Sequence, residues 1–172
     1  MFAGFFRDPN RIPPEGDALV LAPADGKVVA IVKEHEKGED AEAQATRVSI
    51  FLSIFDVHVN RAPIKGSVEK VQYQSGKFHA AYREDASTGN EQNAVRIVDP
   101  RGKSLNVVQI AGLVARRIIC YVKEGQALER GERFGLIMFG SRVDLFLPPD
   151  CTVEVAEGQR VRAGETIIGR FS

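Results

Sequence analysis

The sequence lacks several features that would place the protein in a broad class at once. Lys plus Arg and Asp plus Glu number 23 each, so the formal net charge is zero. Domains that bind nucleic acid usually carry a basic excess, and we therefore expect no nucleic-acid partner. The 172 residues include no apolar run as long as a membrane span, and we identify no signal peptide. Any attraction to an anionic bilayer must then come from a local basic patch.

Cysteine, histidine and helical periodicity are also scarce. The two cysteines, Cys120 and Cys151, have apolar neighbours and no metal-ligand spacing, which predicts buried thiols rather than a disulfide. The three histidines, His35, His58 and His79, are far apart in the chain and predict no metal site. Strong helix patterns are missing throughout, so we predict a mainly β fold.

What the sequence does contain is a series of short apolar runs bounded by Gly, Pro, Asn and Asp, which is typical of strands. With 44% hydrophobic residues, the chain can form one domain, 1–172, that begins with an extended arm at 1–17. The predicted strands cover residues 18–22, 27–32, 48–55, 64–73, 94–98, 105–110, 113–122, 134–139 and 166–171.

Turn residues predict how these strands are joined. Asp25-Gly26 predicts a tight hairpin, and residues 99–102 predict a second one. Residues 33–45 are charged and predict a solvated loop. Residues 75–93 predict a long loop with one helical turn near 79–83, and long loops inside compact domains are often functional.

An internal repeat refines the fold prediction. Residues 124–132 recur as residues 157–165, and each copy precedes an apolar run. The two glycines of each copy allow the sharp turns that fold short strands over one another. The pattern resembles the half-motif of biotinyl and lipoyl carrier domains. We therefore expect a short-stranded sandwich or flattened barrel, similar to a barrel-sandwich hybrid. The modifiable lysine hairpin of the carriers is absent, which argues against a swinging arm.

The step Gly140-Ser141 stands between two apolar runs. Glycine carries no side chain, so a neighbouring hydroxyl can approach its carbonyl. Attack by Ser141 on that carbonyl would convert the peptide into an ester, a form of nucleophilic self-catalysis. For an arbitrary Gly-Ser pair an ordinary turn is the better interpretation.

The surrounding residues favour the reactive interpretation. Residues 139–144 resemble the self-cleavage site of phosphatidylserine decarboxylase proenzymes in their short bacterial and archaeal form. The resemblance continues, in the order of the family, over nearly the whole chain. The other matching runs are Phe5-Phe6-Arg7-Asp8-Pro9, residues 22–28, residues 55–63 and Asn90-Glu91-Gln92-Asn93.

The resemblance implies a chemistry. The chain would be cut between residues 140 and 141 into a large chain, 1–140, and a small chain, 141–172, that stay associated as a heterodimer. Ser141 would become a covalent pyruvoyl group, which does the work of pyridoxal phosphate without a separately bound cofactor. The reaction would convert phosphatidylserine into phosphatidylethanolamine and carbon dioxide. A peripheral location on the cytoplasmic side of the cell membrane follows, and a homo-oligomer is compatible with the sequence.

His58 is the best candidate for acid-base catalysis, because imidazole normally titrates near neutral pH. The alternative is a structural histidine. Asp25 matches the aspartate that the family pairs with the histidine, and a carboxylate could fix the tautomer of His58. Asp56 is expected to be structural and to cap a strand end.

The sequence departs from longer members of the family at Arg61, where they have a second histidine that is usually assigned to self-cleavage. Either His58 does both jobs, or Arg61 supports charge while another group takes the proton. Arg61 could instead bind the substrate carboxylate or phosphate, or be a surface arginine. Asn90, Glu91 and Asn93 are candidate headgroup ligands, with a plain polar loop as the alternative.

Two further features of the sequence allow more than one interpretation. An ordinary ion pair is expected for Arg142 and Asp144, which flank the cut. The apolar N-terminal residues Phe2, Phe5 and Phe6 can dip into a membrane interface or pack on the core. The rival functions are a pyruvoyl decarboxylase of a soluble amino acid and a non-catalytic binding module of the hybrid-sandwich type.

Overall fold

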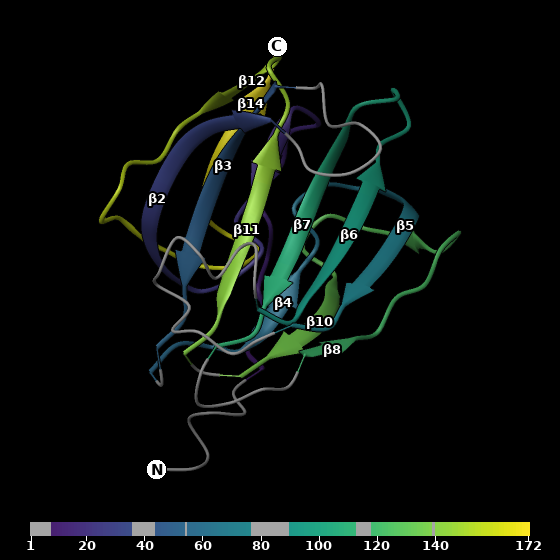
Figure 1. Ribbon diagram of the computed structural model, residues 1–172. Coiled ribbons are helices and arrows are strands. Elements are labelled where there is room, and N and C mark those ends of the chain that lie inside the picture. The colour runs from purple at the N-terminus through teal and green to yellow at the C-terminus, as the bar shows by residue number, and fades with distance from the viewer. Residues whose placement is uncertain (1–7, 36–43, 54, 77–89, 113–117, 139) are drawn as a thin grey trace.

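The computed structural model describes residues 8–35, 44–53, 55–76, 90–112, 118–138 and 140–172 (Figure 1). These residues form fourteen strands, and the described part of the chain contains no helix. The prediction of a mainly β fold is confirmed. Predictions for Phe2, Phe5 and Phe6, for the helical turn at 79–83 and for residues 113–117 lie outside the described residues.

The bounds of the strands are β1 Leu19–Leu21, β2 Gly26–His35, β3 Gln44–Phe51, β4 Val59–Arg61, β5 Gly66–Gln74, β6 Gln92–Val98, β7 Ser104–Ile110, β8 Ile118–Cys120, β9 Ala127–Leu128, β10 Arg133–Ile137, β11 Arg142–Leu147, β12 Cys151–Val153, β13 Arg160–Val161 and β14 Ile167–Phe171. Nine strands overlap the ranges predicted for them, with shifts of a few residues at their ends, and β11 corresponds to the apolar run after Ser141, whereas the short strands β4, β9, β12 and β13 were not predicted.

A curled eight-stranded sheet dominates the molecule. Its order is β13-β2-β3-β11-β7-β6-β5-β9, and all neighbouring strands are antiparallel. Figure 1 shows β2, β3, β11, β7, β6 and β5 running side by side across the molecule. Two three-stranded sheets, β1-β14-β12 and β4-β10-β8, complete the fold.

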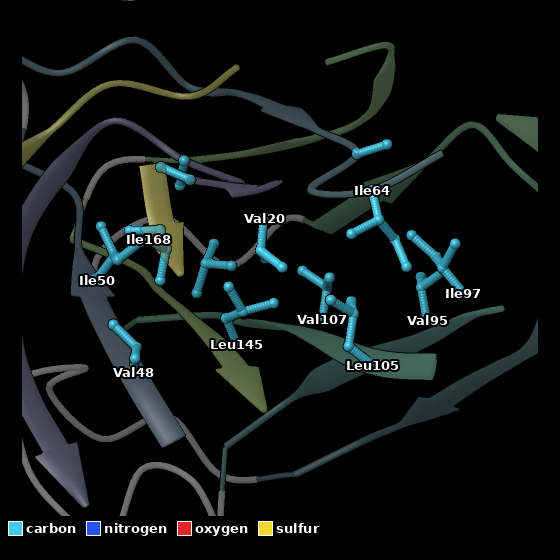
Figure 2. Packing of buried hydrophobic residues seen from close by; sticks show 14 of the residues in the cluster. Val20, Val48, Ile50, Ile64, Val95, Ile97, Leu105, Val107, Leu145 and Ile168 are labelled. Carbon is cyan, nitrogen blue, oxygen red and sulfur yellow. The ribbon is translucent and has the colours of Figure 1, made fainter. Parts of the chain in front are cut away.

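Alternate residues of the large sheet build the core (Figure 2). Val143, Leu145 and Leu147 of β11 all belong to the main apolar cluster, as the two-residue period of a strand requires. The cluster also contains residues of both small sheets, such as Val20 of β1 and Phe134 of β10. The small sheets therefore pack on one face of the large sheet, and the odd-numbered positions of β7 and β11 point toward that core.

Two halves of the chain share one topology. The strands β1, β2, β3, β11, β12, β13 and β14 correspond in turn to β4, β5, β6, β7, β8, β9 and β10, so the large sheet is symmetric about the β11–β7 pair. The backbone bonds correspond as well. The N–H of Leu21 donates to the carbonyl of Pro63 at 3.0 Å, and that of Arg61 donates to the carbonyl of Pro23 at 2.9 Å.

The repeat at 124–132 and 157–165 serves both halves in the same way. Gly125 donates its N–H to the carbonyl of Val68, and Gly158 donates to that of Val28. A second repeat becomes visible beside it, since Ala22-Pro23-x-x-Gly26-x-Val28 matches Ala62-Pro63-x-x-Gly66-x-Val68. One half is continuous, from β4 to β10, and is inserted between β3 and β11 of the other.

One predicted hairpin is confirmed and one is wrong. Residues 99–102 join β6 to β7, which pair along their length. Asp25-Gly26 does not close a hairpin, because β1 pairs with β14 whereas β2 pairs with β3 and β13. The turn instead carries the chain from one sheet to another. Gly26 is required there, since a Cβ built on it would lie 2.2 Å from the carbonyl oxygen of Phe51.

Candidate active site

The candidate residues gather at one end of the large sheet. Because neighbouring strands are antiparallel, the end of β3, the start of β11, the end of β7 and the start of β6 share this edge. Figure 1 shows these strand ends together at the lower side of the molecule. Both connections between the two halves, from β3 to β4 and from β10 to β11, also pass here.

The Gly140-Ser141 step lies in the second of these connections. Gly140 has φ +76°, a left-handed conformation that favours glycine. Its N–H donates to the carbonyl of Leu52 at 2.9 Å, and the N–H of Leu52 donates to the carbonyl of Ser141 at 2.9 Å. Ser141 is fully buried, and its hydroxyl donates to the carbonyl of Met138. The peptide bond between residues 140 and 141 is therefore held firmly on both sides.

Gly112, after β7, forms a wall beside this peptide. A Cβ built on Gly112 would lie 1.9 Å from the carbonyl oxygen of Gly140 and 2.7 Å from its carbonyl carbon. Real side chains do not approach so closely, so only glycine allows this contact. No sequence motif identifies Gly112, because the residue that it contacts, Gly140, lies 28 positions further along the chain.

His58 stands in the other connection and is buried, with 2% of its surface exposed. Its carbonyl accepts a hydrogen bond of 3.1 Å from the N–H of Ile137. Since the Ser141 hydroxyl bonds to Met138, the next residue after Ile137, the segment 137–138 links His58 to Ser141. The structure thus brings the backbone of His58 close to the segment that precedes Ser141.

Behind them lies a layer of buried amides. Asn93 Nδ2 donates to Gln109 Oε1 at 3.1 Å, and Gln109 Nε2 donates to Asn60 Oδ1 at 2.9 Å. Asn90 Nδ2 donates to the carbonyl of Ala111 at 2.8 Å. All four amides are at most 3% exposed. The sequence prediction found Asn90 and Asn93 but missed Asn60 and Gln109.

Asp25 lies at the start of β2, on the same edge of the sheet, but its carboxylate has other partners. Arg11 donates to both carboxylate oxygens, at 2.5 and 2.8 Å, and the N–H of Ala163 donates to Oδ1 at 2.8 Å. The hydrogen bond to Asp25 raises the pKa of the Arg11 guanidinium above its ordinary value. These contacts tie the N-terminal arm to the C-terminal segment. The structure does not show an Asp25–His58 pair, and a catalytic role for Asp25 stays a prediction.

Arg61 is also committed to the arm. It is 5% exposed, so it is not a surface arginine. Its Nη1 donates to the carbonyl of Gly131 at 2.9 Å, and its Nη2 donates to the carbonyl of Pro9 at 2.6 Å. Burial, together with neighbouring arginines, lowers the pKa of this guanidinium below its ordinary value. The described contacts point to anchoring of the arm, and substrate binding by Arg61 stays a prediction.

Two acidic residues of the edge have structural partners. Asp56 Oδ2 accepts from the N–H of Ser53 at 2.8 Å, and Oδ1 accepts from Arg160 at 2.7 Å, which confirms its role in capping the turn after β3. Glu91 accepts a hydrogen bond of 2.7 Å from the exposed hydroxyl of Tyr73. This bond raises the pKa of Tyr73 above its ordinary value.

Arg142 and Asp144 form an ion pair on the outer face of the sheet, as predicted, with 2.9 Å between Arg142 Nε and Asp144 Oδ1. Both side chains are about fully buried, at 2% and 1% exposure. Burial raises the pKa of Asp144, while Arg142, Ser49 and Arg47 act in the opposite direction. This pair stiffens the strand that follows Ser141.

The described residues contain neither a candidate metal site nor a candidate membrane-spanning helix. No group of three His, Cys, Asp or Glu side chains among them could hold a metal ion. Within the same ranges, no helix has the length and apolar character that a membrane crossing needs. The two cysteines are free thiols, and burial raises the pKa of Cys151 to about 11.

Comparison with known proteins identifies the family. The chain matches the family model described as Phosphatidylserine decarboxylase over residues 1–169. It is 51% identical over 169 residues to the Phosphatidylserine decarboxylase proenzyme of Gluconobacter oxydans (strain 621H), covering 97% of this chain and 75% of that protein. These matches show that the chain belongs to the phosphatidylserine decarboxylase family.

Proposed function

We propose that this chain cuts itself between Gly140 and Ser141 and then decarboxylates phosphatidylserine to phosphatidylethanolamine. The observation that carries the proposal is the enclosed Gly140-Ser141 peptide: a left-handed glycine, a buried hydroxyl and a wall made by Gly112. A fixed peptide beside a fixed nucleophile lowers the entropic cost of attack. The family supplies the substrate and the reaction type.

The residues present fit a pyruvoyl group at position 141. Such a group forms in place from Ser141, so it needs no separate binding pocket, and it supplies a carbonyl that accepts electrons when carbon dioxide leaves. Leu52 already donates its N–H to the carbonyl of residue 141 at 2.9 Å. This bond orients the carbonyl next to the reactive centre and draws electron density toward it.

The other side chains have defined tasks in this proposal. In this proposal His58 moves protons beside residue 141, which is supported by its burial and by the hydrogen bond between its carbonyl and the N–H of Ile137. The buried amides and the apolar core exclude water, which strengthens polar interactions inside the site. After the cut, the small chain stays bound to the large one as a heterodimer, since β11 pairs with both β3 and β7.

Substrate delivery requires contact with a bilayer, and the reactive edge carries exposed aromatic rings. Phe55, between β3 and β4, is 77% exposed, and Tyr73, at the end of β5, is 58% exposed. The hydrocarbon ring of Phe55 can enter the apolar side of a lipid boundary, and tyrosine suits such a boundary because it combines an apolar ring with a polar hydroxyl. We propose that this edge docks peripherally on the cytoplasmic side of the cell membrane. Sedimentation with phosphatidylserine vesicles should weaken severalfold for Phe55→Ser.

Intact mass spectrometry of the purified protein tests the cut. The wild type should give two chains, with the small chain starting at position 141 as a ketone. Ser141→Ala should remain one chain and release no carbon dioxide, whereas the control Ser67→Ala, on exposed β5, should be cut like the wild type. An active wild type that stays in one piece would overturn the proposal.

A further inference from the structure

Asn60 of β4 is fully buried, and its Nδ2 has no hydrogen-bond partner within the described part of the chain. Buried amide nitrogens are nearly always bonded, because an unsatisfied donor loses its hydrogen bonds to water without replacing them. A buried donor without a partner in the protein therefore indicates a ligand group or a bound water. The question is which group this donor is placed to meet.

The neighbouring amides fix the direction of this donor. Gln109 Nε2 donates to the carbonyl of Ile119 at 3.2 Å, and a carbonyl can only accept. The same nitrogen therefore faces Asn60, which must present its oxygen to Gln109. Asn93 holds the other end of Gln109. Consequently the Asn60 Nδ2 points away from the amide chain.

The strand registers relate Asn60 to residue 141 through Gln109 of β7. Gln109 lies opposite Val143, two residues after Ser141 and on the same face of the sheet. Asn60 lies in β4, which begins directly after His58. Gly135, opposite Asn60, makes room for Gln109, whose Nε2 would lie 2.6 Å from a Cβ there. The Asn60 donor thus lies farther from the edge of the sheet, toward the core, than position 141, by one pair of opposed residues.

The other predicted headgroup ligands are engaged elsewhere. The Arg61 guanidinium binds Gly131 and Pro9, and the amide nitrogens of Asn90 and Asn93 bind Ala111 and Gln109. Glu91 would repel a carboxylate. Asn60 is therefore the buried side-chain amide, among the described residues, that keeps a donor for a ligand.

We propose that Asn60 Nδ2 donates a hydrogen bond to the carboxylate of the serine headgroup. This assignment rests on the proposed function, because the headgroup amine must meet residue 141 and the carboxylate is attached to the same carbon. A neutral amide orients the carboxylate without the ion pair that an arginine would form. Since the carboxylate loses its charge as carbon dioxide leaves, a weaker ground-state interaction favours the reaction. The product has no carboxylate and cannot make this bond.

The test uses processed wild-type enzyme and Asn60→Asp. This substitution keeps an oxygen toward Gln109 and replaces the donor by an acceptor. Two short-chain competitors are compared in mixed micelles: a phosphatidyl-3-hydroxypropionate, which has the carboxylate but no amine, and phosphatidylethanolamine, which has the amine but no carboxylate. Hydrogen bonds to charged groups predict a roughly tenfold to hundredfold rise in KM for phosphatidylserine and in Ki for the carboxylate competitor. The Ki of phosphatidylethanolamine should stay unchanged.

Controls separate recognition from disturbance of the fold. Asn106→Asp, the same chemical change on the other face of β7, should leave all constants unchanged. If Asn60→Asp fails to fold, Asn60→Ala replaces it in the same comparison. Equal changes for both competitors, or no change for either, would overturn the assignment. A folded Asn60 variant that stays uncut would also overturn it, because the donor would then serve self-cleavage, whereas cutting and carbon dioxide release by the wild type test the proposed function separately.

Discussion

The molecule contains two glycine turns with nearly the same backbone, and only one of them is a candidate for cleavage. At the hairpin between β6 and β7, Gly102 has φ +85°, and at the candidate site Gly140 has φ +76°. Gly102 donates to the carbonyl of Asp99 at 3.0 Å, as Gly140 donates to that of Leu52 at 2.9 Å. The N–H of Asp99 donates to Lys103 at 2.8 Å, as that of Leu52 donates to Ser141 at 2.9 Å.

The two turns differ in what surrounds them. The β6–β7 hairpin is exposed at Arg101 and Gly102, and Lys103 extends to Asp150. In the other half the hairpin is interrupted, since residues 53–139 are inserted between Leu52 and Gly140. The insertion brings His58 and the amide layer to the turn, and Ser141 is buried. We therefore expect that a left-handed glycine alone does not make a peptide reactive, and that enclosure and a neighbouring hydroxyl are also required.

Gly112→Ala should have the largest effect, because Gly112 packs directly against the candidate turn at Gly140. The added Cβ would lie 1.9 Å from the Gly140 carbonyl oxygen. Overpacking costs about 1–3 kcal/mol of stability, and a displacement of about 1 Å can slow a reaction by about a hundredfold. Denaturing gels over time should show cutting slowed by more than about tenfold. Cutting at the wild-type rate would mean that the wall is irrelevant.

Gly140→Ala and Gly102→Ala compare the two turns directly. Each forces a side chain into a left-handed conformation, which costs about 1–2 kcal/mol. Urea unfolding, with Ser141→Ala as the common background, should show similar losses for both. In the wild-type background only Gly140→Ala should slow cutting. If Gly102→Ala slowed it equally, the effect would belong to general stability.

Asp99→Asn tests what holds the unreactive turn. Burial works to raise the pKa of Asp99, but hydrogen bonds from Arg101 and Lys103 together lower it below the ordinary 3.8. A lowered folded-state pKa gives stability that is present above pH 3.8 and is lost as the pH falls through the folded-state pKa. Asn should therefore cost about 1–2 kcal/mol at pH 7. Unfolding curves of the two proteins should converge in acid, and a constant difference would contradict this origin.

Lys103→Ser should have the smallest effect. It creates a second Gly-Ser step with the same backbone, but on an exposed hairpin and without a histidine among its described contacts. Mass spectrometry should find no cut after Gly102. A fragment ending at that residue would show that the turn geometry and a hydroxyl suffice, and the contrast between the two turns would lose its meaning.

Local patterns in the sequence predict much of this fold but not its assembly. Alternation and turn residues give most strands and the hairpin at 99–102, while the Gly140-Ser141 step gives the candidate site. Asp25-Gly26 misleads, because turn chemistry fixes a change of direction and not the partner of the next strand. Gln109 is one of three polar residues in β7, and its role depends on contacts with Asn60 and Asn93, which belong to other strands. Gly112 is likewise defined by a distant contact.

The position of β11 at the middle of the eight-stranded sheet limits what the cut protein can do afterwards. The fragment 141–172 contributes β11 to β14, and these pair with β1, β2, β3 and β7 of the other fragment. Release of the fragment 141–172 would require most of the sheet to unfold, so we expect no exchange of fragments between molecules. Each molecule would then form its reactive end group only once, and chemical damage to that group would inactivate the molecule permanently.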